Sequence, residues 1–188
     1  MARLAACKRV WRGSSYQLKA MLFLLFQLGK DRYALEASRV VEVVPFLALK
    51  KLPQAPKGFA GLMNYRGRPV PTVDLCELTT NQPAAERLST RIIIVNAPDG
   101  QGGQRLLGLI AERATEMLRK DPKEFVDPGF RVSGAPFLGP VLLDSKGAIQ
   151  WILEQHLLSE PVRELLFAER AELAKLAQTV GQETLLNQ

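Results

Sequence analysis

The chain has 188 residues, of which 47% are hydrophobic and 23% charged, a composition that is typical of a folded domain and argues against disorder throughout. Its net charge of +6 is concentrated at one end, because residues 1–20 hold five basic side chains and no acidic one, which leaves +1 for the rest. A domain so close to neutrality lacks the basic surface that a nucleic-acid backbone requires, so this class of partner is disfavoured.

Residues 1–20 are interpreted as a basic N-terminal tail, either a flexible arm or an extension that is not part of the natural protein, whose start would then be Met21. Nothing in the tail alternates or repeats at helical spacing, and Met21 directly precedes a strand-like run. That apolar run is too short for a secretory signal. No apolar stretch in the sequence approaches the ~18 residues that a membrane-spanning helix needs. The two cysteines, Cys7 and Cys76, are far apart and suit a reducing compartment, so we expect a cytoplasmic protein.

The first predicted elements are short strands. Residues 22–28 are apolar and aromatic, residues 29–32 are turn-forming, and residues 33–35 resume the apolar pattern, which predicts a hairpin. Residues 37–44 contain four valines and end at a proline, which favours another strand. Prolines and a glycine make a long regular element improbable within residues 45–60.

The middle of the chain continues in the same way. Residues 68–75 contain two prolines in alternation, which predicts an edge strand or a barrel corner, and residues 81–86 are predicted as a surface loop. Residues 92–95 form the clearest buried strand, and the glycine-rich turn at 99–103 pairs it with residues 106–111.

The last predicted strands form a hairpin over residues 141–153, after a polar segment at 121–136. Ser159 can cap a helix, so residues 159–188 are predicted as an amphipathic C-terminal helix and tail. Its apolar face would consist of Val162, Leu165, Leu166, Leu173 and Leu176. No helices alternate with the strands, so a nucleotide-binding α/β fold is disfavoured and a barrel or sandwich is expected.

No reaction class is indicated by the side chains. His156 is the only histidine, so a zinc cluster built on several histidines is excluded. The glycines at 102, 103 and 108 join two strands and are not followed by the Lys-Ser/Thr pair of a phosphate loop. The acidic candidates Glu42, Asp74 and Asp144 lie far apart in sequence. We therefore expect no enzyme activity, no catalytic residue, no metal and no cofactor.

The stretch Asn-Tyr-Arg-Gly-Arg-Pro-Val-Pro-Thr-Val-Asp-Leu at residues 64–75 resembles the signature of the CheW-like domain. That signature has Asn, a hydrophobic residue, Arg and Gly, then Pro, a hydrophobic pair and Asp-Leu. The resemblance covers roughly residues 22–158. The flanking segments that agree with it are 26–29, 33–35, 40–44, 52–53, 108–110 and 147–153.

The resemblance implies an all-β fold of two five-stranded β-barrel lobes sharing a hydrophobic core, spanning residues 21–158. It implies a non-catalytic adaptor that bridges the cytoplasmic tip of methyl-accepting chemoreceptors to the regulatory domain of a CheA-type histidine kinase. Other CheW-like proteins are further candidate partners. Such an adaptor is cytoplasmic and reaches the membrane only through receptor arrays. Whether it serves flagellar chemotaxis or a surface-sensing pathway that controls a diguanylate cyclase stays open.

The same resemblance assigns receptor and kinase binding to Val40, Glu42 and Arg66. An exposed guanidinium suits this task because its fixed fork binds carboxylates and carbonyls at a helical receptor tip. The alternatives are structural. Arg66 could hold the corner through an internal ion pair with Glu42 or Asp74, Glu42 could be an exposed acid without a role, and Val40 could be a core residue.

Asn64, Gly67 and Asp74 are interpreted as structural residues of the corner, with Asp74 accepting backbone hydrogen bonds at a strand end. Tyr65 departs from the family pattern, which usually has an aliphatic residue there. An apolar groove between the lobes would take a receptor helix by its spaced anchors, and exposed barrel ends would dock the kinase.

Two rival functions remain at this stage. A small-molecule-binding β-barrel predicts a roomy cavity with convergent polar groups, whereas an adaptor predicts a filled core. A nucleic-acid-binding barrel requires stacking aromatic residues beside basic ones, and only the tail offers these, at Arg9, Trp11, Arg12 and Tyr16.

Overall fold

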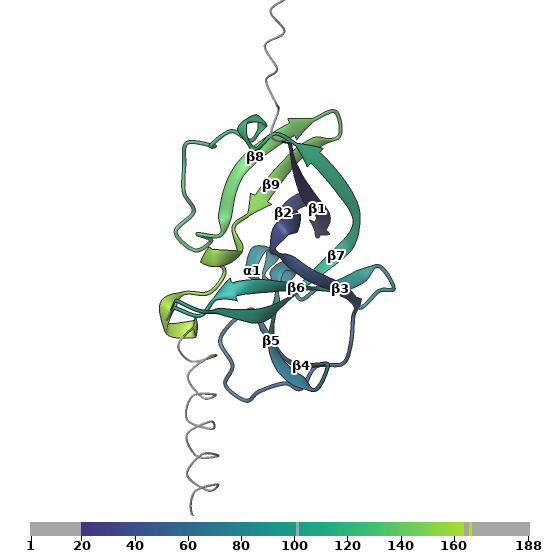
Figure 1. The fold of residues 1–188 in the computed structure, drawn as a ribbon, viewed down its shortest axis with the longest axis vertical. Helices are drawn as coiled ribbons and strands as arrows, with labels where there is room; N and C mark the ends of the chain where they lie inside the picture. The colour runs from purple at the N-terminus through teal and green to yellow at the C-terminus, as the bar shows by residue number, and fades with distance from the viewer. Residues whose placement is uncertain (1–19, 101, 164–165, 167–188) are drawn as a thin grey trace, which may run out of the picture.

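The computed structural model describes residues 20–100, 102–163 and 166, and this part of the chain is built from strands (Figure 1). Its nine strands form one continuous sheet in the order β3-β6-β7-β1-β2-β9-β8, with β5 paired to β7 and β4 paired to β5. The strands are β1 (Met21–Leu28), β2 (Asp31–Glu36), β3 (Val40–Pro45), β4 (Phe59–Tyr65), β5 (Arg68–Asp74), β6 (Thr90–Pro98), β7 (Gln104–Lys120), β8 (Leu138–Asp144) and β9 (Gly147–Ile152). The predicted all-β class is confirmed.

Strand β7 organises the molecule because both lobes share it. Its residues 104–112 pair with β6, and residues 108–110 also pair in parallel with β5. Its residues 112–120 pair with β1. We call the strands β1, β2, β8, β9 and the second half of β7 lobe 1, and β3, β4, β5, β6 and the first half of β7 lobe 2. In Figure 1 lobe 1 lies above lobe 2, and each lobe draws on five strands.

One hydrophobic core runs through both lobes, as expected for the predicted two-lobed fold. Buried residues of β1, β6 and β7 meet the end of β9 and the segment after it in one cluster, which includes Phe26, Val95, Leu109, Ile152 and Leu158. Alternate residues of β6 face a second cluster inside lobe 2, which includes Ile92 and Ile94. Because residues 92–95 of β6 are buried on both faces of the strand, this part of its sequence is continuously apolar and does not alternate with polar residues.

Several elements differ from the sequence-based boundaries. Strand β7 continues to Lys120, well beyond the predicted 106–111. Its second half is largely exposed and carries polar side chains, so this part of the sequence lacks the apolar run that marks a buried strand. A short helix α1 (Leu75–Thr80) follows β5 where no helix was predicted. Residues 20–163 also include three single-turn 3-10 helices among the positions described, η1 (Ala37–Arg39), η2 (Pro122–Glu124) and η3 (Glu154–His156).

The predicted tail and most of the predicted C-terminal helix lie outside the described residues. Residues 160–163 are helical, and the backbone N–H of Arg163 donates to the carbonyl of Ser159 at 2.8 Å. A helix therefore begins next to the predicted cap. Within the described ranges, no helix combines the length and the apolar character that crossing a membrane would require.

A bidentate ion pair ties β2 to the β8–β9 turn in lobe 1. The two terminal guanidinium nitrogens of Arg32 lie 2.7 and 2.5 Å from the carboxylate oxygens of Asp144. The backbone N–H of Lys146 donates to the same carboxylate at 2.7 Å. These contacts, the Arg32 hydrogen bond foremost, lower the pKa of Asp144 from 3.8 to about 2.

This shift predicts a specific acid sensitivity. Because the pKa of Asp144 is lower in the folded state, the pair stabilises the fold above pH 4 and loses this contribution as the pH falls from 4 towards 2. We expect the urea midpoint of the wild type to fall more steeply in that window than the midpoint of Asp144→Asn. Parallel curves for the two proteins between pH 5 and pH 2 would contradict the shift.

Candidate functional site

The candidate site is built around the two-residue turn between β4 and β5. Tyr65 pairs directly with Arg68, so Arg66 and Gly67 form the whole loop. Both have positive φ, +52° for Arg66 and +80° for Gly67, as a tight hairpin turn of the primed type requires. The N–H of Gly67 donates to the side-chain oxygen of Asn64 at 2.9 Å. Asn64 and Gly67 thus shape a turn that leaves the Arg66 side chain 73% exposed.

Arg66 is not isolated on this surface. One of its terminal nitrogens lies 2.8 Å from Oε2 of Glu42, and the Tyr65 hydroxyl donates to the same oxygen at 2.5 Å. The Arg66 guanidinium carbon also lies 5.1 Å from the centroid of the Tyr65 ring. Glu42 comes from β3, an edge strand, so the cluster joins two segments that are distant in sequence. We call Glu42, Tyr65 and Arg66 the surface triad.

The ion pair of the triad lies at the surface, because Arg66 is exposed and Glu42 only half-buried, whereas Tyr65 is half-buried and packs against the lobe 2 cluster. Surface ion pairs of this kind contribute about 0–1 kcal/mol to stability. The hydrogen bond to Glu42 raises the pKa of the Tyr65 phenol, because the bond stabilises the protonated form that donates it. The aromatic residue at position 65 thus supplies a hydroxyl that an aliphatic residue could not.

Val40 lies at the start of β3, on the same strand as Glu42 but in a different environment. Its side chain is half-buried and packs against the shared core. The exposed valines of this strand are Val41 and Val43, with 44% and 37% of their surface accessible. The sequence does not distinguish these two valines, because a run rich in valine does not show which of its side chains face solvent.

Asp74 lies at the far end of β5 from the turn, so it does not share a corner with Asn64 and Gly67. It is 5% exposed and caps α1. Its carboxylate accepts three backbone N–H groups, from Cys76 at 2.9 Å, Glu77 at 3.2 Å and Ala84 at 2.8 Å. Burial raises the pKa of Asp74, and the three hydrogen bonds oppose that rise.

The three acidic candidates do not converge. Glu42 belongs to the triad, Asp74 caps α1, and Asp144 pairs with Arg32 in the other lobe. Among the side chains that the structure describes, no group of three or more His, Cys, Asp and Glu residues is placed to hold a metal ion.

An apolar groove of about 650 Å³ lies on lobe 2. Its walls come from the loop before β4, from β4 and β5, from the β6–β7 hairpin and from the helix that starts at residue 160, and they include Leu52, Pro56, Phe59, Val70, Leu106 and Leu166. This groove belongs to lobe 2 and the start of the C-terminal helix, so it is distinct from the predicted groove between the lobes, which stays a prediction.

The fold and the site define the class of the protein as an all-β, two-lobed domain that presents structured turns at its surface. Residues 22–161 match the model of the CheW-like domain, and the chain belongs to that family. A solved structure with the same architecture is the scaffolding protein TtCheW from Thermoanaerobacter tengcongensis, with a TM-score of 0.67 and 25% identity. That match covers 78% of this chain and 93% of the other.

Two curated relatives are similar in sequence. The chemotaxis protein CheW of Klebsiella aerogenes is 27% identical over 96 residues, which are 51% of this chain and 55% of the relative. The chemotaxis protein CheW of Helicobacter pylori is 24% identical over 101 residues, 54% of this chain and 58% of the relative. The aligned part thus spans little more than half the length of each curated relative.

Proposed function

We propose that this chain is a non-catalytic adaptor that couples methyl-accepting chemoreceptors to a CheA-type histidine kinase in a chemosensory array. The observation that carries the proposal is the CheW-like match over residues 22–161, within which Arg66 of the surface triad stands in an exposed turn. The relatives named as chemotaxis and scaffolding proteins support the same role. No comparison supports the small-molecule-binding alternative.

The receptor would bind at the triad. The Arg66 guanidinium has five N–H donors, and its bond to Glu42 leaves donors available on a side chain that is 73% exposed. Glu42 and Tyr65 hold this fork in one orientation, so less side-chain freedom is lost when it binds a carboxylate or a helix-end carbonyl. The exposed Val41 and Val43 lie on the same strand as Glu42 and would add apolar contact.

The kinase would bind at an exposed apolar surface of lobe 1. We propose that this surface includes four exposed apolar side chains, Val126, Phe130, Val132 and Leu143, whose exposed fractions run from 47% to 77%. Val126 is held by two backbone hydrogen bonds of 2.8 Å with Val141 of β8. We call these four residues the lobe 1 patch, and it lies on a different lobe from the triad.

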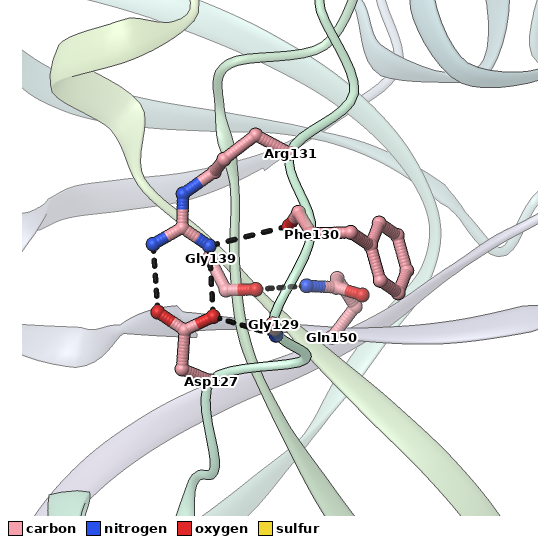
Figure 2. A network of polar contacts seen from close by, with 6 residues as sticks. All are labelled: Asp127, Gly129, Phe130, Arg131, Gly139 and Gln150. Atoms are coloured by element: carbon pink, nitrogen blue, oxygen red, sulfur yellow. Dashed lines mark hydrogen bonds and ion pairs between the residues drawn. The ribbon is translucent and has the colours of Figure 1, made fainter.

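The loop that carries Phe130 is held by a local polar network (Figure 2). The Asp127 carboxylate binds both terminal nitrogens of Arg131, at 3.0 and 2.7 Å, and accepts the N–H of Gly129 at 2.9 Å. Beneath the loop, Gln150 of β9 donates to the carbonyl of Gly139 in β8. A loop fixed in this way presents Phe130 at a low entropic cost of binding.

Phe130→Ser is therefore expected to weaken binding of the kinase regulatory domain by about ten-fold, the scale of an aromatic anchor at an interface. Binding of the receptor fragment should not change, because the triad lies on lobe 2. Isothermal titration with each partner separates the two effects. Leu88→Ser is the matched control, since Leu88 is 96% exposed and lies outside the patch. Equal losses for both variants would remove the patch from the kinase interface.

The proposal is tested by co-sedimentation of the full chain with a receptor cytoplasmic fragment and the kinase from the same cell. We expect the chain to bring the two partners into one complex, in a cytoplasmic setting where receptors provide the only link to the membrane. If the well-folded chain sediments with neither partner, the adaptor role is wrong.

A further inference from the structure

A second ion pair reaches the strand that carries Glu42, and its carboxylate comes from lobe 1. Arg39 is the last residue of η1, directly before β3, and Glu154 is the first residue of η3, just after β9. The Nε atom of Arg39 lies 3.3 Å from Oε1 of Glu154. Because β9 belongs to lobe 1 and β3 to lobe 2, the pair joins the lobes at the point where the chain passes from β2 to β3.

Glu154 is buried, which is an unfavourable setting for a carboxylate. Its side chain is 4% exposed, whereas the Arg39 side chain is 45% exposed. Burial raises the pKa of the Glu154 carboxyl, and its own backbone N–H and the Arg39 charge oppose that rise. An apolar side chain at such a position would stabilise the fold as well as a buried ion pair or better. The placement of this carboxylate therefore indicates a role besides packing.

The position of β3 depends on how the strand enters the sheet. Within the described sheet, β3 stands at one end of the strand order and pairs with β6. The pairing is irregular at its start, because β3 advances two residues, from Val40 to Glu42, for one residue of β6. Val41 is thus an extra residue, and bulges of this kind bend a strand and re-aim its side chains. The bulge begins directly after Arg39, so the entry to β3 determines where Glu42 points.

Glu42 connects this entry to the surface triad. Along an extended strand, the three residues from Arg39 to Glu42 span about 10 Å. Oε2 of Glu42 accepts both the hydroxyl of Tyr65 at 2.5 Å and a terminal nitrogen of Arg66 at 2.8 Å. A shift of β3 would therefore loosen both contacts at once, although Glu154 is not itself part of the triad.

We propose that Glu154 is a positioning residue of the surface triad: it holds Arg39 at the entry to β3 and thereby fixes Glu42. Through Glu42 it sets the orientation of the Arg66 guanidinium. Glu154 acts from a buried site, so it would not itself touch a receptor. The effect on receptor affinity rests on the proposed adaptor role, whereas the effect on the geometry of the triad does not.

The Tyr65 phenol reports on the triad in the free chain. Its hydrogen bond to Glu42 raises its pKa, so loss of that bond moves the pKa back towards the ordinary value of 10.0. The full chain, with isotope-labelled tyrosines, is titrated with base while the ring signals are followed by NMR, and circular dichroism checks that it stays folded. Tyr65→Phe identifies the signal among the three tyrosines.

We expect Glu154→Gln to lower the pKa of Tyr65, because the amide keeps the size of the side chain but loses the charge that holds Arg39. Arg39→Gln should lower it equally, and the double variant no further, because residues that act through one contact are not additive. Asp144→Asn is the matched control. It removes the carboxylate of the ion pair with Arg32, within lobe 1, and should leave the pKa of Tyr65 unchanged.

Titration with the receptor fragment gives the second readout. Glu154→Gln should weaken binding about three-fold, and it should have no further effect on a chain that already carries Arg66→Ala. An unchanged affinity for a folded variant whose Tyr65 pKa has fallen would overturn the link between the orientation of the triad and binding.

The two readouts separate this proposal from the adaptor role. The same Tyr65 pKa in the wild type and in folded Glu154→Gln would overturn the positioning role, whatever the receptor does. If Glu154→Gln does not fold, an unchanged pKa of Tyr65 in Arg39→Gln would overturn it in the same way. A lowered pKa of Tyr65, found with a wild-type chain that binds no receptor, would support the positioning role and count against the adaptor role alone.

Discussion

Replacing Arg66 with alanine is expected to reduce receptor binding by about 10- to 30-fold, the range of an interface hot spot. The fold should persist, because the arginine is 73% exposed and its pair with Glu42 contributes at most about 1 kcal/mol. Titration with a receptor fragment gives the affinity, and urea unfolding gives the stability of the same preparation.

Two further variants sharpen this result. Arg66→Lys keeps the charge but loses the planar fork, so we expect it to restore little affinity if two N–H groups bind the receptor together. Arg119→Ala removes another exposed arginine, on β7 in lobe 1, and should leave binding unchanged. An Arg66→Ala protein that unfolds would show instead that the triad is structural, which is the alternative raised by its bond to Glu42.

Replacing Asp74 with alanine should have the opposite effect to Arg66→Ala: a large loss of folding stability. The change removes the cap of α1 and leaves the buried N–H of Cys76 and the part-buried N–H groups of Glu77 and Ala84 without their acceptor. Loss of a cap and of acceptors for buried donors costs about 2–4 kcal/mol. Urea unfolding followed by circular dichroism measures this cost.

Asp74→Asn provides the graded control. Its side-chain oxygen can still accept from the first turn of α1, but its amide nitrogen cannot accept the N–H of Ala84. We expect an intermediate loss of stability, with receptor affinity preserved in whatever fraction stays folded. A loss of affinity in folded Asp74→Asn, at unchanged stability, would place Asp74 in the binding surface and would contradict its assignment as a cap.

The sequence predicted the strands that local patterns define. The hairpin of β1 and β2, the buried β6 and the hairpin of β8 and β9 all have apolar runs bounded by turn residues, and the structure has them there. Helix α1 was missed because a single six-residue helix has too few turns to show a period. A signal was present, since Asp74 followed three residues later by Glu77 is the pattern of a helix cap.

The candidate site was only partly predictable. The Asn64-x-x-Gly67 turn follows from local chemistry, and the resemblance marked Glu42 and Arg66. Their direct contact joins β3 to the β4–β5 turn, and the sequence analysis left it open as one of two possible partners for Arg66. The bond between Arg32 and Asp144 was not anticipated at all, because 112 residues separate them. Such contacts depend on how the strands are ordered in the sheet, which local patterns do not encode.

The central claim is coupling, and the most direct measurement is kinase autophosphorylation in a reconstituted array. The full chain is mixed with a receptor cytoplasmic fragment and the CheA-type kinase from the same cell, and phosphate incorporation is followed with and without the chain. We predict stimulation that requires this chain and that Arg66→Ala reduces while Arg119→Ala does not. Kinase activity that is the same with the wild-type chain, with Arg66→Ala and with no chain would contradict the adaptor role.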